Sequence, residues 1–173
     1  FDLQQRANSE GVDLNRGFPD QYTDPRWSSS GRAHEVKLVM DYLQSEDFKW
    51  TLSANLHGGD LVVNYPYDSN TRSTSVYSAT PDDAIFIKVS KAYAHLNPAM
   101  MSNRYFRDGI TNGADWYALN GGMQDWNYLF LDCMETTIEV SKISKWPPAS
   151  ELPGYWDDNK AALLNYARQV QNS

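Results

Sequence analysis

The sequence predicts an α/β layered fold, and three observations support this prediction. Hydrophobic residues make up 41% and charged residues 21% of the 173-residue chain, which is ordinary for one globular domain with a sizeable core. Three stretches have the apolar periodicity of amphipathic helices, and three others have the alternation or the short apolar run of strands. Because these stretches interleave along the chain, we expect helices packed on a sheet.

Three helices are expected, each from an apolar stripe on one face. The first covers residues 33–45, the second follows Thr80-Pro81-Asp82-Asp83, and the third covers residues 157–171. Thr80 is a good N-cap, Pro81 suits the first helical position, and the two aspartates face the positive end of the helix dipole. The stripes consist of Val36, Val39, Met40 and Leu43 in the first helix, Ile85, Val89, Ala92, Tyr93 and Leu96 in the second, and Leu163, Tyr166, Ala167 and Val170 in the third.

Strands are expected at Trp50–Asn55, Leu61–Val63 and Cys133–Val140. In the last of these, alternation places Ile138 and Val140 on one face, and Glu135, Thr137 and Glu139 on the other. The long stretch from Pro98 to Leu131 is rich in Gly, Asn and aromatic residues and has little periodicity. Such a segment in a compact domain is usually functional, so we expect an irregular functional stretch there.

Charge and apolar content exclude two classes of partner. The net charge is −7 and the sequence pI is near 4.8, without a run of Lys or Arg, so no nucleic-acid partner is expected. An acidic surface instead attracts cationic peptides. No apolar run approaches the length needed to cross a bilayer, so no membrane span is expected in this chain. The single cysteine, Cys133, has no partner for an internal disulfide.

Two residues stand at positions that favour chemistry. His57 follows an apolar strand and precedes two glycines, so its side chain lies at the rim of the sheet, as suits a metal ligand or a general base. A histidine with no function is the alternative. Glu139 lies in an otherwise apolar strand, where a carboxylate is costly to bury unless it is paired or used. The alternative is a strand whose second face is solvated, which also explains Glu135 and Thr137.

Two further positions could recognise a ligand. Asn15 and Arg16 are adjacent, and such a pair can hold a carboxylate through the planar guanidinium and the amide. A turn with a surface arginine explains the same residues. Asp68 follows Asn64-Tyr65-Pro66-Tyr67 and is equally consistent with a turn residue.

Four segments together resemble the zinc metallocarboxypeptidases of the regulatory branch, which includes carboxypeptidases D, E, M and N. They occur in family order and with family-like spacing over nearly the whole chain. The segments are GVDLNRGFPDQ at 11–21, LSANLHGGDLVVNYPYD at 52–68, DGITNGADWYALNGGMQDWNYL at 108–129 and CMETTIEVS at 133–141. The resemblance implies a mixed β-sheet flanked by helices, with residues 1–173 forming the C-terminal two-thirds of a catalytic domain.

The resemblance also implies roles in zinc-dependent removal of a C-terminal residue. His57 matches the third zinc ligand, and Glu139 matches the general base that takes a proton from water. Arg6, nine residues before Asn15, matches the arginine that stabilises the oxyanion, and Tyr117 matches the mobile tyrosine that closes over substrate.

The same resemblance implies a peptide substrate that ends in Lys or Arg. Asn15 and Arg16 match the pair that binds the terminal carboxylate. Asp68 matches the acid of the side-chain pocket, and Gln124 lines that pocket in the family. Family members of this branch are secreted or belong to the secretory pathway, and we expect the same here.

The main departure from the family is the absence of an HxxE motif, which supplies the first two zinc ligands, upstream of Asp13-Leu14-Asn15-Arg16. We therefore expect a companion N-terminal fragment or chain to supply these ligands, and the chain alone to be inactive. Gly17 also replaces a second Asn of the family. Two alternatives stay open: a module that binds basic C-termini without catalysis, and a structural subunit that keeps only the fold.

Overall fold

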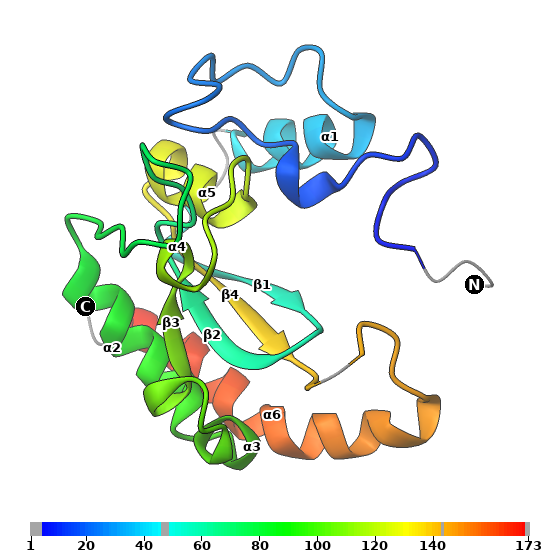
Figure 1. The fold of residues 1–173 in the computed structure, drawn as a ribbon, viewed down its shortest axis with the longest axis vertical. Coiled ribbons are helices and arrows are strands. Elements are labelled where there is room, and N and C mark those ends of the chain that lie inside the picture. Colours follow the sequence, from blue (N-terminus) through cyan, green and yellow to red (C-terminus); the bar gives the residue numbers. More distant parts are fainter. Residues whose placement is uncertain (1–4, 46–48, 143, 172–173) are drawn as a thin grey trace.

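The computed structural model describes residues 5–45, 49–142 and 144–171, and its centre is a mixed four-stranded β-sheet (Figure 1). The strand order is β1-β4-β2-β3. β1 is parallel to β4, β2 is antiparallel to β4, and β3 is parallel to β2. The strands are β1 (Leu52–His57), β2 (Leu61–Tyr65), β3 (Ile110–Asn112) and β4 (Met134–Val140). This is the α/β architecture with a mixed sheet that the sequence predicted.

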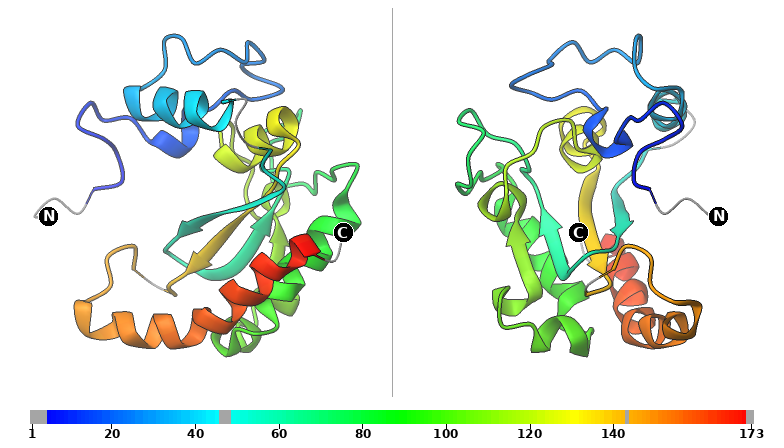
Figure 2. Two further views of the ribbon diagram at one scale, coloured as in Figure 1. Left: turned by 180° about the vertical axis from the view of Figure 1, so that it is seen from behind. Right: turned by 45° about the vertical axis from the view of Figure 1, so that its right-hand side comes forward.

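Helices cover both sides of this sheet (Figure 2). Two long helices, α2 and α6, pack against one face, while α1 and α5 lie over the other side, toward the carboxyl-terminal segment of β2 (Figure 1). The α-helices are α1 (His34–Leu43), α2 (Asp83–Ala94), α3 (Pro98–Ser102), α4 (Gly113–Trp116), α5 (Met123–Leu131) and α6 (Leu152–Arg168). Short 3₁₀ helices are η1 (Leu14–Arg16), η2 (Arg107–Gly109), η3 (Ala149–Glu151) and η4 (Gln169–Gln171). In the described part of the chain, no helix is long and apolar enough to cross a membrane.

The three predicted helices are confirmed, but their ends and buried faces differ from the prediction. Helix α2 begins at Asp83 with Asp82 as N-cap residue, so Thr80 is not the cap. Val89 and Tyr93 of the predicted stripe are buried, but Ile85 and Leu96 are exposed, because the buried face of α2 is completed by Phe86, Ser90 and Ala94. In α6, which begins five positions earlier than predicted, Tyr166 is buried and Ala167 is exposed; Val170, which lies beyond α6 in η4, is also exposed. In α1, Val36 and Met40 are buried as predicted, whereas Val39 is exposed.

The stretch from Pro98 to Leu131 is not irregular as predicted. It contains α3, η2, β3, α4 and α5. Apart from α5, each of these elements is too short to produce a periodic apolar pattern. Helix α5 was missed because its buried residues include polar ones, Gln124, Asp125 and Asn127 beside Trp126. The stretch nevertheless runs past the site described below, at Tyr117 and Leu119.

The two faces of the sheet differ in character, and this difference positions the site. One face packs on α2 and α6 through an apolar cluster that includes Val63, Ile138, Tyr93 and Tyr166. The other face carries Glu135, Thr137 and Glu139, all three of which are buried. The alternative of a solvated second face is therefore wrong. Carboxylates that are buried this deeply need a partner or a use.

A second apolar cluster fixes the N-terminal segment over the polar face. Phe18, Val36, Met40 and Trp126 are buried together, so α1 and α5 hold the chain around η1 in place. Phe18 stacks obliquely on Trp126, with ring centroids 5.5 Å apart. Because η1 immediately precedes Phe18, this packing also sets the position of Asn15 and Arg16 relative to the sheet.

Candidate active site

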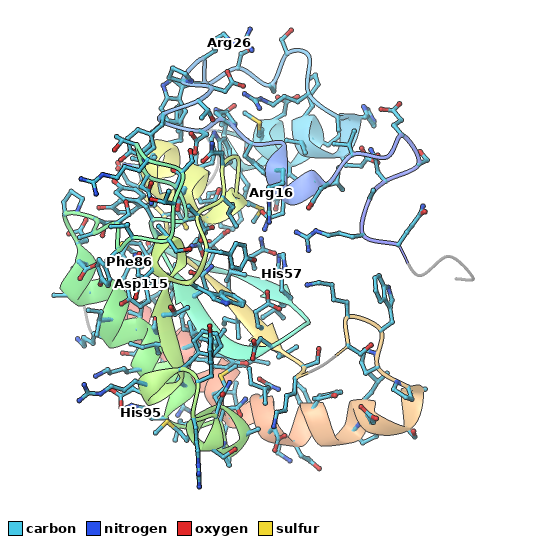
Figure 3. All side chains as sticks on the ribbon, in the orientation of Figure 1. Arg16, Arg26, His57, Phe86, His95 and Asp115 are labelled. Carbon is cyan, nitrogen blue, oxygen red and sulfur yellow. The ribbon has the colours of Figure 1, made fainter. Side chains whose placement is uncertain are left out.

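The polar face of the sheet leads to a small cavity where four distant segments of the chain meet. Arg16 extends from η1 on one side, and His57 lies at the end of β1 on the other (Figure 3). Seven of the eight residues singled out from the sequence line this cavity, together with Asn64, Leu119 and Thr137. The seven are Arg6, Asn15, Arg16, His57, Asp68, Tyr117 and Glu139.

Strand pairing brings His57 and Glu139 together. They are register partners on the parallel strands β1 and β4, so their side chains point to the same face. His57 Nδ1 lies 4.0 Å from Glu139 Oε1. Glu139 Oε2 is buried and has no hydrogen-bond partner among the described residues. A buried carboxylate oxygen without a partner is available to a bound water or substrate group.

Burial shifts both groups away from their charged forms. Desolvation raises the pKa of Glu139 to about 7, although the charges of Lys145 and Arg6 oppose this shift. Desolvation lowers the pKa of His57 to about 4, and the charges of Arg6, Lys145 and Arg16 lower it further. A neutral imidazole can act as a metal ligand, and a carboxylate with a pKa near neutrality suits a general base.

The N-terminal segment is arranged by Asp13. Its Oδ1 accepts a hydrogen bond from Asn15 N (3.1 Å) and so caps η1, while Oδ2 accepts from Arg6 Nε (2.6 Å). Asn15 in turn accepts from Met123 N (2.9 Å) at the start of α5, which leaves its Nδ2 3.5 Å from His57 Nε2. Asn15 thus satisfies a free N–H of α5 and faces the cavity with its amide.

Arg16 is exposed, and it contacts the Tyr117 hydroxyl as well as a backbone oxygen. Its NH1 group donates to Asn15 O (2.8 Å), and no salt bridge joins Arg16 to a carboxylate within residues 5–45, 49–142 and 144–171. A guanidinium with free donors at a cavity can bind a carboxylate. This arrangement does not fit a purely structural arginine in a buried ion pair.

Asp68 lies at a bend after β2, and its side chain is buried in the interior. Only 2% of its surface is exposed, and Oδ1 accepts from Asn64 Nδ2 (2.9 Å). Asn64 lies near Gln124, whose Oε1 accepts from Thr137 N (2.9 Å) and whose Nε2 is 3.5 Å from Asn64 Oδ1. Gln124 therefore supports Asp68 through Asn64 from behind the lining of the cavity. Burial raises the pKa of Asp68 to about 6.

Two residues of this cluster were not found from the sequence. Asp125 accepts from Asp68 N (2.9 Å), Ser69 N (3.1 Å) and Ser69 Oγ (3.2 Å), and it thereby fixes the backbone that carries Asp68. Burial, and the nearby Asp68 charge, raise the pKa of Asp125 well above its usual range. Asn64 is the other. Its signal was a polar side chain within the apolar run of β2, Leu61–Tyr65.

Glycine leaves room for the Asp68 carboxylate. A Cβ on Gly113 would lie 1.9 Å from Asp68 Oδ1, and one on Gly122 would lie 3.0 Å from Asp68 Oδ2. Any side chain at position 113 would therefore displace the carboxylate. Tyr117, on the segment between these glycines, is 40% exposed, and burial of its hydroxyl raises its pKa.

The described residues do not by themselves fit a catalytic zinc. Such a zinc needs three protein ligands, and in the part of the chain that the structure covers no group of three His, Cys, Asp or Glu side chains could hold a metal. His57 could supply one ligand at the rim, since its half-buried ring favours the neutral form and its Nδ1 lies 4.0 Å from Glu139 Oε1. The other ligands are not among these residues.

Comparison with known proteins gives a consistent result. The profile of the zinc carboxypeptidase family matches residues 2–162. Carboxypeptidase D of Rattus norvegicus is 46% identical over 177 residues, which cover 95% of this chain and 12% of that protein. Carboxypeptidase M of Mus musculus is 42% identical over 174 residues, which cover 95% of this chain and 38% of that protein. The chain therefore spans a minor part of each relative's length.

Solved structures show the same fold. Bovine thrombin-activatable fibrinolysis inhibitor, in complex with tick carboxypeptidase inhibitor, superimposes with a TM-score of 0.70 at 21% identity, covering 99% of this chain and 61% of that one. Carboxypeptidase A from Helicoverpa armigera superimposes with a TM-score of 0.68 at 17% identity, covering 91% of this chain and 41% of that one. From the sequence match over most of its length, the chain belongs to the zinc carboxypeptidase family.

Proposed function

We propose that this chain is part of a zinc-dependent exopeptidase that releases C-terminal Lys or Arg from peptides. The observation that carries the proposal is the cavity that joins Arg16, Asp68 and Glu139. In this proposal Arg16 and Asn15 bind the terminal carboxylate, and Asp68 binds the basic side chain. Only a free C-terminus offers a carboxylate to Arg16, which explains exopeptidase action.

In the same proposal Glu139 carries the proton transfer. Water adds to the scissile carbonyl carbon, Glu139 accepts a proton from that water, and it gives a proton to the leaving amine as the C–N bond breaks. Arg6 donates to the oxygen that becomes negative in the tetrahedral intermediate. Tyr117, which is 40% exposed at the cavity, closes over the bound peptide.

We infer that two of the three zinc ligands come from polypeptide outside these 173 residues, with His57 as the third. Two features support this. The family is a zinc family, whereas the described residues lack a three-ligand group. β1 is at the edge of the sheet, and its residue Leu56 is 55% exposed. Apolar residues of α1 are exposed too, among them Leu38 (54%) and Tyr42 (59%). An unpaired edge and exposed apolar side chains fit contact with further polypeptide. We expect a secreted or secretory-pathway protein, as among its relatives.

A pair of peptides tests the proposal. The complete protein, which includes the polypeptide that carries the remaining zinc ligands, is incubated with a peptide ending in Lys and with the same peptide amidated at its C-terminus. Mass spectrometry should show loss of one Lys from the free acid alone, because the amide offers no carboxylate to Arg16. The 173-residue chain alone should cleave neither peptide.

Two results would contradict the proposal. Cleavage of the amidated peptide at a comparable rate would show that Arg16 does not select a free C-terminus. Tight binding of the free acid without any cleavage by the complete protein would favour the binding module. The supporting observation for that module is the exposed Arg16, which forms no salt bridge among the described residues.

A further inference from the structure

The segment that follows β4 folds back over the turn that follows β1. Gly59 N donates to Ser141 O (2.9 Å), and Ser141 Oγ donates to Ser144 O (2.7 Å). A Cβ on Gly58 would lie 2.6 Å from Ser141 Oγ and 3.5 Å from Lys145 Cα. The glycine at this position therefore permits a close contact that holds Lys145 beside the end of β1.

Lys145 places an ammonium group at the rim of the active site. Its Nζ donates to Gly58 O, one residue after His57. A Cβ on Gly59 would lie 3.0 Å from Lys145 Nζ and 3.8 Å from Glu139 Oε2, so both charged groups lie beside this glycine. An ammonium has three donors, and Gly58 O uses one of them.

Among the described residues, the ammonium of Lys145 has no carboxylate within salt-bridge distance. Across the described ranges, no salt bridge joins Lys145 to a carboxylate, whereas Arg6, the other cation near Glu139, is paired with Asp13 at 2.6 Å. Asp60 directly follows Gly59, the glycine beside Lys145. Its Oδ1 is engaged elsewhere: it accepts from Leu61 N (2.8 Å) and lies 3.4 Å from Asn103 Nδ2.

The charged groups are ordered along the cavity. At one end, Asn64, which donates to Asp68 Oδ1, pairs with Thr137, two residues before Glu139 on β4. At the other end, Gly59 N donates to Ser141 O, two residues after Glu139, and the Lys145 ammonium lies beside this glycine. Lys145 therefore lies beyond Glu139 along β4, as seen from Asp68.

We propose that Lys145 forms a subsite that favours Asp or Glu as the residue preceding the C-terminal Lys or Arg. This inference rests on the proposed function. With the terminal carboxylate at Arg16 and the basic side chain at Asp68, the scissile carbonyl lies at Glu139, and the preceding residue extends toward Lys145. An acidic side chain there pairs with the ammonium. Since Lys145 is exposed, the gain is about two- to fivefold in kcat/KM, the range of a solvated ion pair.

Two peptides that differ in one charge test the subsite. The complete, zinc-loaded protein is given acetyl-Ala-Glu-Lys and acetyl-Ala-Gln-Lys, and kcat/KM is measured for each. Glu and Gln match in size and shape, so the Glu-to-Gln ratio reports charge. Lys145→Gln should lower this ratio about two- to fivefold. Because both peptides are cleaved by the same protein, any effect of the lost charge on Glu139 cancels from the ratio. Lys145→Arg should keep the native ratio. Raising the salt to about 0.5 M should reduce the native ratio toward that of Lys145→Gln.

Lys142→Gln is the matched control, because Lys142 is an exposed lysine on the same segment. Its ratio should equal the native one. Equal ratios for the native protein and Lys145→Gln would overturn the subsite while cleavage of the Gln peptide still upholds the proposed function. An equal loss on both peptides in Lys145→Gln would also overturn it. Failure of the native protein to cleave either peptide would overturn the proposed function, and the subsite with it.

Discussion

Glu139→Gln is expected to lower the turnover of a peptide ending in Lys by at least about 10²- to 10⁴-fold in the complete, zinc-loaded protein. Gln keeps the size and shape of the side chain but cannot accept a proton. Glu139 Oε2 has no hydrogen-bond partner among the described residues, so the change breaks no bond of that oxygen. Peptide affinity should change little, because Arg16 and Asp68 still hold the substrate. Zinc content should also be unchanged.

Glu135→Gln is the matched control for this variant. It makes the same chemical change four positions earlier, on the same face of β4, where Glu135 accepts from Ser53 Oγ (2.5 Å) and Asn127 Nδ2 behind the cavity. Its turnover should stay near the native value. Turnover, affinity and zinc are measured on one preparation of each protein. Native-like turnover of Glu139→Gln would contradict the role of general base.

Asp68→Asn should reduce kcat/KM for peptides ending in Lys or Arg by well over tenfold and affect peptides ending in Leu little. Removing one partner of a buried charge pair costs about 2–5 kcal/mol. Asn preserves the shape and can still accept from Asn64 Nδ2, which donates to Asp68 Oδ1 at 2.9 Å. The variant therefore tests charge rather than packing. Equal losses on basic and apolar substrates would show that Asp68 supports the site without selecting the side chain.

Gly113→Ala tests the same pocket by displacing the Asp68 carboxylate. The added Cβ would lie 1.9 Å from Asp68 Oδ1, so the carboxylate must move, and selectivity for basic residues should fall. Gly154→Ala is its control, since a Cβ there meets nothing within 4 Å. Comparison of the two variants on Lys and Leu peptides separates loss of Asp68 geometry from a general effect of alanine. Full selectivity in Gly113→Ala would contradict the placement of Asp68.

The sequence predicted the fold class and most of the site because motifs specify strand ends and turns. His57 and Glu139 stand 82 positions apart yet are register partners, and strand pairing alone makes them neighbours. The apolar periodicity that predicted α2 was less accurate about its face. Ser90 and Ala94 are small residues that are fully buried, and their burial is invisible to a count of large apolar side chains.

The residues that were missed share a physical reason. Asp125 and Asn64 act by hydrogen bonding to the Asp68 segment, with 57 positions between Asp68 and Asp125. Such contacts depend on the tertiary packing of α5 against the sheet, for which local patterns give no signal. β3 spans only Ile110–Asn112, too short to alternate. Lys145 likewise gains its place at the rim only through contact with the Gly58–Gly59 turn.

The zinc content of the purified complete protein tests the central claim most directly. We expect close to one zinc per molecule in the native protein, because in the proposed function His57 is joined by two ligands from outside these 173 residues. His57→Ala should lose most of it, since a catalytic zinc relies on three protein ligands. The 173-residue chain alone should hold no stoichiometric zinc. A complete native protein without zinc, or a His57→Ala variant that retains it in full, would contradict the account.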